Sequence, residues 1–312
     1  SAASSVFNSI NFDEKSVIIV LETAYGLIDN LIQKQVDLYN CKIEVIKVNL
    51  YNIQRVEADI SARIKEITEN DYYKIKLVCI DHISSCPGIV IPVCDIAQEC
   101  KKYNIPVLVD GAHALGQVEI DLKKFQEAGV KCWFTDTHKW FFSPKGSALF
   151  WVDTEYQDKI FPTIDCTSIS SKGCTVIQHE NKNITSFEDR FMYLGTKDYT
   201  PWIAINAAID FVESYGEYRN LILRNHKLAL WAQKYLADML ESATIDDNLT
   251  ASMSNIYLPF INSKEESEKL SIFLQEKNIF VVICEYNNSF WLRLCIQLFI
   301  DVTNIVRLKN AL

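Results

Sequence analysis

The chain has 312 residues, of which 49% are hydrophobic and 23% charged, and its formal net charge at pH 7 is −9. This length is enough for two domains. The acidic balance disfavours nucleic acid as a partner, because nucleic-acid binders concentrate basic residues on one face. Apolar runs such as residues 16–21 are far shorter than the roughly 20 residues that cross a bilayer, so we expect no membrane partner.

The cysteine pattern bears on the redox compartment. None of the ten cysteines forms a CxxC pair, and several, such as Cys79 and Cys132, lie inside apolar runs. This pattern predicts small buried thiols in a reducing compartment rather than a disulfide or zinc framework. The first twelve residues contain no Lys or Arg and show no signal peptide. We therefore expect a cytoplasmic protein without a metal site.

Short β-branched runs alternate with helical patterns over the first half of the chain. The runs are nearly continuous in apolar residues, which is typical of strands in a sheet covered on both faces. The helical patterns between them supply the crossovers that parallel strands need. The sequence therefore predicts an open, mostly parallel α/β sheet. The expected strands are residues 16–21, 43–48, 75–80, 106–110, 131–135 and 147–152, and the expected helices are residues 24–37, 56–68, 90–103 and 121–128.

The pattern changes after the last of these strands. Residues 153–186 are polar and predict an irregular segment, and a long helical pattern begins after Pro201 and extends to about residue 241. The remainder predicts a small α+β unit. We therefore divide the chain into a large domain, residues 1–205, and a small C-terminal domain, residues 206–312. In the small domain the expected strands are residues 253–260, 279–284 and 290–297, and the expected helices are residues 264–277 and 301–312.

Two neighbouring strands end in ionisable side chains. Asp110 ends the strand at residues 106–110 and His113 follows it, and His138 and Lys139 follow the next strand. Because open α/β sheets bind ligands at the carboxyl ends of their strands, we expect Asp110 and Lys139 to face one crevice. An acid opposite a lysine suits pyridoxal 5′-phosphate (PLP), whose aldehyde reacts with a lysine and whose pyridinium nitrogen pairs with an acid. On these residues alone, an ordinary turn and a solvent-facing lysine are equally good interpretations.

Longer motifs decide between these interpretations. Taken together they resemble the class V aminotransferase family of PLP enzymes, and within it the branch of isopenicillin N epimerase-like proteins and C–S lyases. The resemblance implies a PLP-dependent transferase-like large domain of fold type I, with a mostly parallel mixed sheet, and a small α+β C-terminal domain. The motifs are residues 81–92 (DHISSCPGIVIP), 107–117 (VLVDGAHALGQ), 135–140 (TDTHKW), 143–150 (SPKGSALF), 195–200 (GTKDYT) and 291–297 (WLRLCIQ).

The resemblance implies catalytic roles for three of these residues. Lys139 forms the Schiff base with PLP and then moves the substrate proton. Asp110 pairs with the pyridinium nitrogen, and His113 lies beside the cofactor ring. His138 resembles the family's residue that contacts the phosphate or the ring of the cofactor.

Further contacts follow from the same resemblance. Tyr25 stacks on the pyridine face, and Ser85 reaches the phenolic oxygen of the cofactor. Thr196 reaches the cofactor phosphate of a neighbouring subunit, which implies a homodimer with shared active sites. Arg293 binds the α-carboxylate of an amino-acid substrate, since a guanidinium group forms two parallel bonds to a carboxylate. For Tyr25 and Arg293 the alternatives are a helix-start aromatic residue and a structural ion pair.

The sequence leaves the reaction open among epimerase, C–S lyase and aminotransferase chemistry. Cysteine desulfurase is disfavoured, because that reaction needs a mobile nucleophilic cysteine well upstream of Arg293. Cys284 and Cys295 both lie in apolar strands, and this pattern predicts that their side chains are packed. The family's phosphate-binding turn is present here only from Ser1, so a truncated or non-catalytic PLP-fold protein serving as a dimeric binding scaffold is the alternative. A nucleotide-binding domain lacks support, because the chain contains neither GxGxxG nor GxxxxGKS/T.

Overall fold

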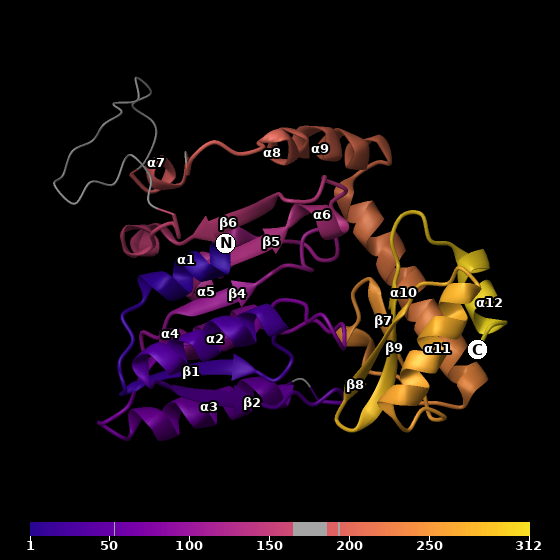
Figure 1. Cartoon of the computed structure of the whole chain (residues 1–312), viewed down its shortest axis with the longest axis horizontal. Helices are drawn as coiled ribbons and strands as arrows, with labels where there is room; N and C mark the ends of the chain where they lie inside the picture. The colour runs from indigo at the N-terminus through magenta and orange to yellow at the C-terminus, as the bar shows by residue number, and fades with distance from the viewer. Residues whose placement is uncertain (53, 165–185, 193) are drawn as a thin grey trace.

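The computed structural model describes residues 1–52, 54–164, 186–192 and 194–312. Its larger part is a six-stranded sheet in the order β2-β1-β3-β4-β5-β6 (Figure 1). All neighbouring strands are parallel except β5 and β6, which are antiparallel. The strands are β1 (Ser16–Leu21), β2 (Lys42–Ile46), β3 (Lys74–Asp81), β4 (Val107–Asp110), β5 (Val130–Asp136) and β6 (Ala148–Val152).

Helices cover both faces of this sheet, as the apolar strands predict. They are α1 (Ala2–Ser9), α2 (Gly26–Tyr39), α3 (Gln54–Thr68), α4 (Val93–Lys101) and α5 (Leu122–Ala128), with the one-turn helix α6 (Thr137–Trp140) directly after β5. Alternate residues of a strand point to opposite faces. Ile19 of β1 accordingly packs in one core cluster with Ile60 of α3, and its neighbour Ile18 packs in the other with Ile28 of α2. Helices α3, α4 and α5 share the first cluster, and α1 and α2 share the second.

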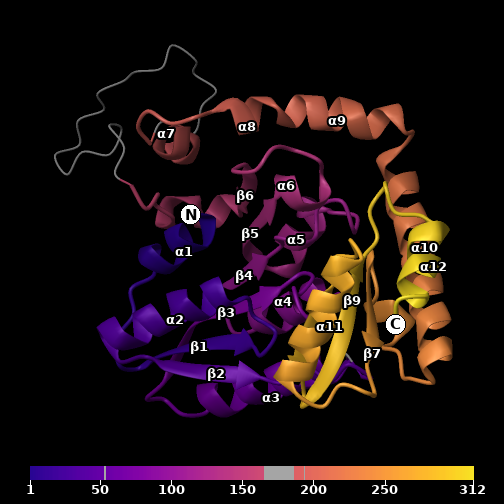
Figure 2. The ribbon, with the colours of Figure 1, turned by 45° about the vertical axis from the view of Figure 1, so that its right-hand side comes forward.

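The C-terminal part is a second, antiparallel sheet in the order β7-β9-β8. It has its own apolar core with α10, α11 and α12, and it lies beside the larger sheet (Figures 1 and 2). Helices α8 and α9 form a separate layer above β6, and α10 runs from them into the smaller part. The elements are η1 (Thr154–Lys159), α7 (Ser186–Met192), α8 (Thr200–Ile203), α9 (Ile205–Ser214), α10 (Tyr218–Leu240), η2 (Asp247–Leu249), β7 (Met253–Tyr257), α11 (Lys264–Glu276), β8 (Val282–Tyr286), β9 (Ser289–Cys295) and α12 (Val302–Lys309).

The predicted fold class is confirmed, and each predicted strand is present with small shifts at its ends. The helical pattern after Pro201 is divided among α8, α9 and α10, and Gly216 lies between the last two with a φ of 107° that favours glycine. The predicted irregular segment contains η1, and its residues 165–185 lie outside the described residues. In the described part of the chain, no helix has the length and hydropathy of a membrane span.

The prediction of unpaired, packed thiols is wrong at three positions. Cys86 and Cys284 form a disulfide, and Cys295 is exposed on β9 rather than packed. An apolar local sequence indicates burial, but it carries no information about a partner 198 residues away. Cys166 and Cys174 lie outside the described residues. The prediction holds for four buried cysteines without a disulfide, which are Cys41, Cys79, Cys100 and Cys132.

Candidate active site

Asp110 is the last residue of β4 and lies at the carboxyl edge of the parallel sheet. Its side chain is buried, and one carboxyl oxygen accepts a hydrogen bond of 2.9 Å from the backbone N–H of Ala112. Burial raises the pKa of Asp110 to about 6, while the Ala112 hydrogen bond and the charge of Lys139 both act to lower it. The carboxyl group of Asp110 is therefore within electrostatic range of the amine, as the strand-end positions predict.

Lys139 lies in α6, which begins directly after β5. Its Nζ is 2.9 Å from Oδ2 of Asp136 and 5.9 Å from the ring centroid of Tyr25. Tyr25 is the N-cap residue of α2, and its side chain is exposed. Two predicted residues that are far apart in the sequence thus meet at the ends of β1 and β5. The amine is accessible, as a group that reacts with an aldehyde must be.

Hydrogen bonds fix the orientation of both histidines of the site. Nδ1 of His113 accepts a hydrogen bond of 3.1 Å from the indole N–H of Trp140. Burial, with the charges of Lys139 and Arg293, lowers the pKa of His113 to about 3, so its ring is neutral at pH 7. Nδ1 of His138 lies 3.3 Å from the carbonyl oxygen of Ser147 and is its donor, since a carbonyl only accepts.

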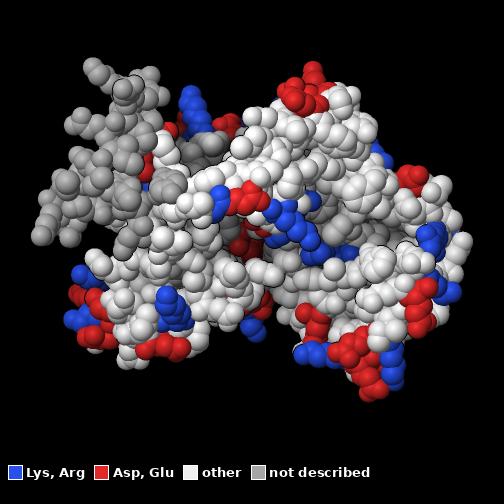
Figure 3. Space-filling view, turned by 45° about the horizontal axis from the view of Figure 1, so that its top comes forward, with Lys and Arg blue, Asp and Glu red and all other residues white. Residues whose placement is uncertain are grey.

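Arg293 reaches the site from the smaller sheet. It lies on β9, and its guanidinium group donates to the backbone carbonyl of Ser85 and, at 3.3 Å, to the hydroxyl of the same residue. Its Nε is buried and has no hydrogen-bond partner within the described chain. Because its charge also lowers the pKa of His113, Arg293 and Lys139 both act on one histidine. Figure 3 shows this face hollowed between the two parts of the molecule, with acidic and basic side chains close together there.

The structure thus brings together Arg293 of β9 and the predicted residues at the carboxyl ends of β1, β3, β4 and β5. Thr196 is the exception, because it is exposed in the connection between α7 and α8. Its predicted role requires a neighbouring subunit, so it stays a prediction.

Sequence reasoning missed two acids of the site. Asp136 forms the ion pair with Lys139, and its position three residues before the lysine at a helix start is a signal that would have found it. Asp81 ends β3 in register with Asp110, and its carboxyl accepts a 2.9 Å hydrogen bond from the hydroxyl of Thr23. Burial, and then the charge of Asp110, raise the pKa of Asp81 to about 8. The signal for Asp81 in the sequence was an acidic residue at the end of an apolar strand.

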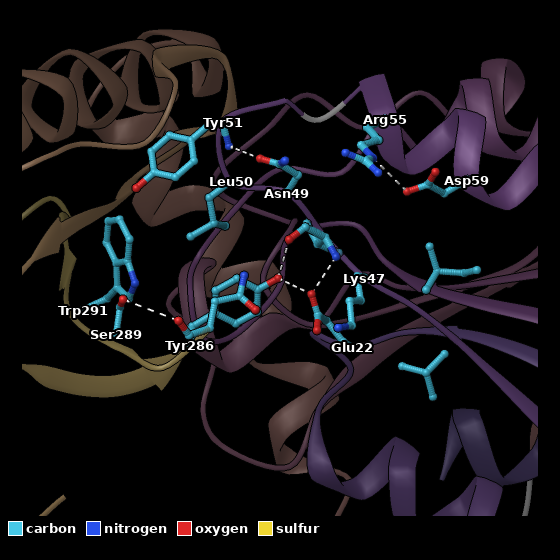
Figure 4. A pocket seen from close by; sticks show the side chains of 14 residues that line it. Glu22, Lys47, Asn49, Leu50, Tyr51, Arg55, Asp59, Tyr286, Ser289 and Trp291 are labelled. Atoms are coloured by element: carbon cyan, nitrogen blue, oxygen red, sulfur yellow. Dashed lines mark hydrogen bonds and ion pairs between the residues drawn. The ribbon is translucent and has the colours of Figure 1, made fainter. Parts of the chain in front are cut away.

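A separate pocket of about 750 Å³ lies between β2 and the β8–β9 hairpin (Figure 4). Its lining includes Glu22, Lys47, Tyr286 and Trp291, and it contains none of the predicted site residues. The hydroxyl of Tyr286 donates to Oε1 of Glu22 at 2.5 Å and lies 2.6 Å from the carbonyl of Val48. These contacts hold the hairpin against the larger sheet.

The residues at the sheet edge fit PLP by their chemistry. They comprise an accessible amine on Lys139, a buried acid on Asp110, a neutral imidazole on His113 and an exposed aromatic ring on Tyr25. When bound, PLP supplies an electron sink for the pair released at the substrate α-carbon. Lys139 would hold the aldehyde carbon and Asp110 the pyridine nitrogen.

The family described as Aminotransferase class-V matches residues 2–283. The chain is 25% identical over 311 residues to the hercynylcysteine sulfoxide lyase of Schizosaccharomyces pombe, covering 99% of this chain and 75% of that protein. It is 26% identical to the isopenicillin N epimerase of Streptomyces clavuligerus, over 53% of this chain and 41% of that protein. The solved structure of the cystine C–S lyase C-DES with cysteine persulfide superposes with a TM-score of 0.80 at 18% identity, covering 99% of this chain and 78% of that one. The chain therefore belongs to the class V aminotransferase family of PLP-dependent enzymes.

Proposed function

We propose that the chain is a C–S lyase that acts on an amino acid with a free α-carboxylate and sulfur on its β-carbon. The observation that carries the proposal is that the Lys139 amine lies within electrostatic range of the Asp110 carboxyl and of His113, which the Arg293 guanidinium also reaches from the smaller sheet. Support for the lyase branch comes from the lyase of Schizosaccharomyces pombe, which matches almost the whole chain.

Each side chain of the site has a separate role in the proposed reaction. The guanidinium group of Arg293 binds the substrate carboxylate and so fixes the α-carbon relative to Lys139. The amine of Lys139 takes the α-proton in its neutral form, and Asp136 stabilises the ammonium group that results. Asp110 would hold the pyridine nitrogen of PLP, which when bound supplies the sink for the electron pair of the α-carbon. The sulfur group then leaves the β-carbon with the electron pair of the bond that breaks. Tyr25 and His113 would restrict the ring of PLP, while His138 and Ser85 would supply further contacts to the cofactor.

A borohydride experiment tests the role of Lys139. We expect the protein with added PLP to show a visible absorption band that borohydride bleaches, and peptide mass analysis to find the pyridoxyl group on Lys139. Lys139→Ala should lose both the band and the release of sulfide from cysteine or cystine. Lys145→Ala, a change of an exposed lysine in the following loop, is the matched control and should keep both. Absence of the band in wild-type protein would favour the non-catalytic scaffold.

Epimerisation is the second candidate, supported by the similarity to isopenicillin N epimerase. Exchange of the α-hydrogen in deuterated water separates the two reactions. An epimerase returns the intact amino acid with deuterium and inverted configuration, whereas a lyase releases the sulfur group. Transamination would instead consume a second, keto-acid substrate.

We also propose a homodimer. Several large apolar side chains of α8 and α9 and their flanks are exposed, and burial of such a surface favours association. Thr196 lies in the segment that leads into α8, consistent with a role at the partner's site. The exposed apolar residues are Trp202, Ile203, Ile209, Phe211 and Tyr215.

The domain boundary near residue 205 and the cytoplasmic location remain predictions.

A further inference from the structure

The loop between β3 and α4 is held firmly on both sides of its tip. On one side, the hydroxyl of Ser84 donates to the carbonyl of Pro87 at 2.6 Å. On the other, the N–H of Gly88 donates to Oδ1 of Asn255 at 2.9 Å, and Nδ2 of Asn255 donates back to the carbonyl of Gly88 at 2.8 Å. These groups are buried, so the two ends of the tip have fixed positions.

The tip itself, Ser85 and Cys86, contacts the hairpin of the smaller sheet. Arg293 of β9 donates to Ser85, and Cys86 is linked to Cys284 of β8 with a Cα–Cα distance of 6.2 Å. In the hairpin, Cys284 and Arg293 lie on adjacent paired strands. The disulfide therefore fixes Cys86, which is next to Ser85, the residue that contacts Arg293.

Cys86 and Cys284 are both partly exposed, whereas most free cysteines of the described chain are buried. Exposure is a condition for exchange with small thiols and disulfides. The pair is the one disulfide of the described residues, and both of its cysteines are open to such exchange.

We propose that Cys86 and Cys284 are a redox-active modification site for low-molecular-weight thiols and disulfides, and that their oxidised state orients Arg293 for the substrate carboxylate. The second half rests on the proposed function of Arg293. In oxidation, two protein thiols and one external disulfide give the Cys86–Cys284 bond and two external thiols, so two electrons pass from the protein to the reagent. In reduction, two external thiols return them.

Reduction should act on the loop tip and leave the position of the hairpin intact. The hydroxyl of Tyr286 still holds the hairpin to Glu22 and Val48 at the edge of the larger sheet. Ser85 and Cys86, in contrast, lose one of their two attachments to the hairpin. Arg293 then has a less fixed partner, so binding of the carboxylate weakens while the proton transfer at Lys139 is unaffected.

The test compares oxidised and reduced PLP-loaded protein, prepared with glutathione disulfide and with a phosphine. Differential alkylation and peptide mass analysis should find a Cys86–Cys284 linkage only after oxidation. We expect reduction to raise KM by about fivefold or more, which is the lower range of coupling between sites, with kcat nearly constant. Cys86→Ser, Cys284→Ser and the double variant should each have the KM of the reduced enzyme. None of them should respond to the phosphine, because each lacks the same disulfide bond.

Cys94→Ser is the matched control, since Cys94 is also partly exposed but lies in α4 and has no disulfide, and it should keep the wild-type response. Hydrogen exchange of residues 83–90 is a readout that needs no activity, and it should increase on reduction in wild type but not in Cys86→Ser. Failure of the linkage to form, or unchanged exchange on reduction, would overturn the redox site. A linkage with altered exchange and constant KM would overturn its effect on Arg293. Protein that is inactive in both states but shows the linkage and altered exchange would refute the lyase function alone.

Discussion

At the scale of single residues, the most unusual feature is the carboxyl pair of Asp81 and Asp110. Residues in register on adjacent parallel strands point to the same face of a sheet, and both side chains are buried at the edge of the site. Two buried carboxyl groups so close together cannot both ionise easily. Asp81 has the higher pKa, about 8 against about 6 for Asp110, so Asp81 retains the proton at neutral pH. Asp110 is then the ionised partner for a pyridinium nitrogen.

This pair predicts a pH dependence of stability in the cofactor-free protein. An Asp of an unfolded chain has a pKa of about 3.9. Between that value and about 8, folded Asp81 binds a proton that the unfolded chain lacks, so its contribution to the free energy of unfolding falls as pH rises. The slope from one such proton is at most about 1.4 kcal/mol per pH unit. Asp81→Asn removes this titration and should gain stability relative to wild type from about pH 5 to about pH 8.

Urea unfolding at several pH values measures this difference. Asp71→Asn changes an exposed carboxyl group and should leave the wild-type slope unchanged. Equal slopes for wild type and Asp81→Asn would show that Asp81 ionises normally in the folded protein.

At the scale of elements, the loop between β3 and α4 depends on a strand of the other sheet. Asn255 on β7 is fully buried, and its amide makes two hydrogen bonds to the backbone of Gly88. Gly88 itself has no room for a side chain, because an added Cβ would lie 2.8 Å from the Cβ of Met253. The position of Ser85, and through it of Arg293, is thus set by contacts between the two sheets.

Asn255→Ala should therefore lower the free energy of unfolding by about 2–4 kcal/mol, because it leaves the buried N–H and C=O of Gly88 without partners. Denaturant unfolding gives the value. Asn262→Ala, at an exposed position, should change it by less than about 0.5 kcal/mol. A loss from Asn255→Ala as small as that of the control would mean that water replaces the amide.

At the scale of the whole molecule, the site lies between two sheets with separate cores. The cluster beneath the larger sheet also includes Trp291 and Tyr286 of the hairpin, so the two parts share apolar contacts as well as hydrogen bonds. Helices α8 and α9 form the layer above β6 (Figure 2). Several of their apolar side chains are exposed. This layer is the surface that we assign to the second copy of the chain.

Ile203→Glu should weaken the dimer, because the side chain of Ile203 is 70% exposed and a charge there would be desolvated in the interface. Sedimentation velocity over a concentration series should show a dimer for wild type and a shift to monomer for the variant. Ile272→Glu on α11, also an exposed isoleucine, should keep the dimer. Monomeric wild-type protein at high micromolar concentration would contradict the homodimer.

The sequence by itself determined the elements and much of the site, because both depend on local patterns. Apolar runs indicate buried strands wherever they pair, and the carboxyl ends of parallel strands meet at one edge, so the strand pattern predicted that Asp110 and Lys139 face one crevice. Tyr25 was predicted from the resemblance of the motifs to the family. Only the tertiary structure decided which partners meet across long separations. The disulfide of Cys86 spans 198 residues, and the contact of Arg293 with Ser85 spans 208. Such pairs depend on how the two sheets pack, and no local pattern contains that information.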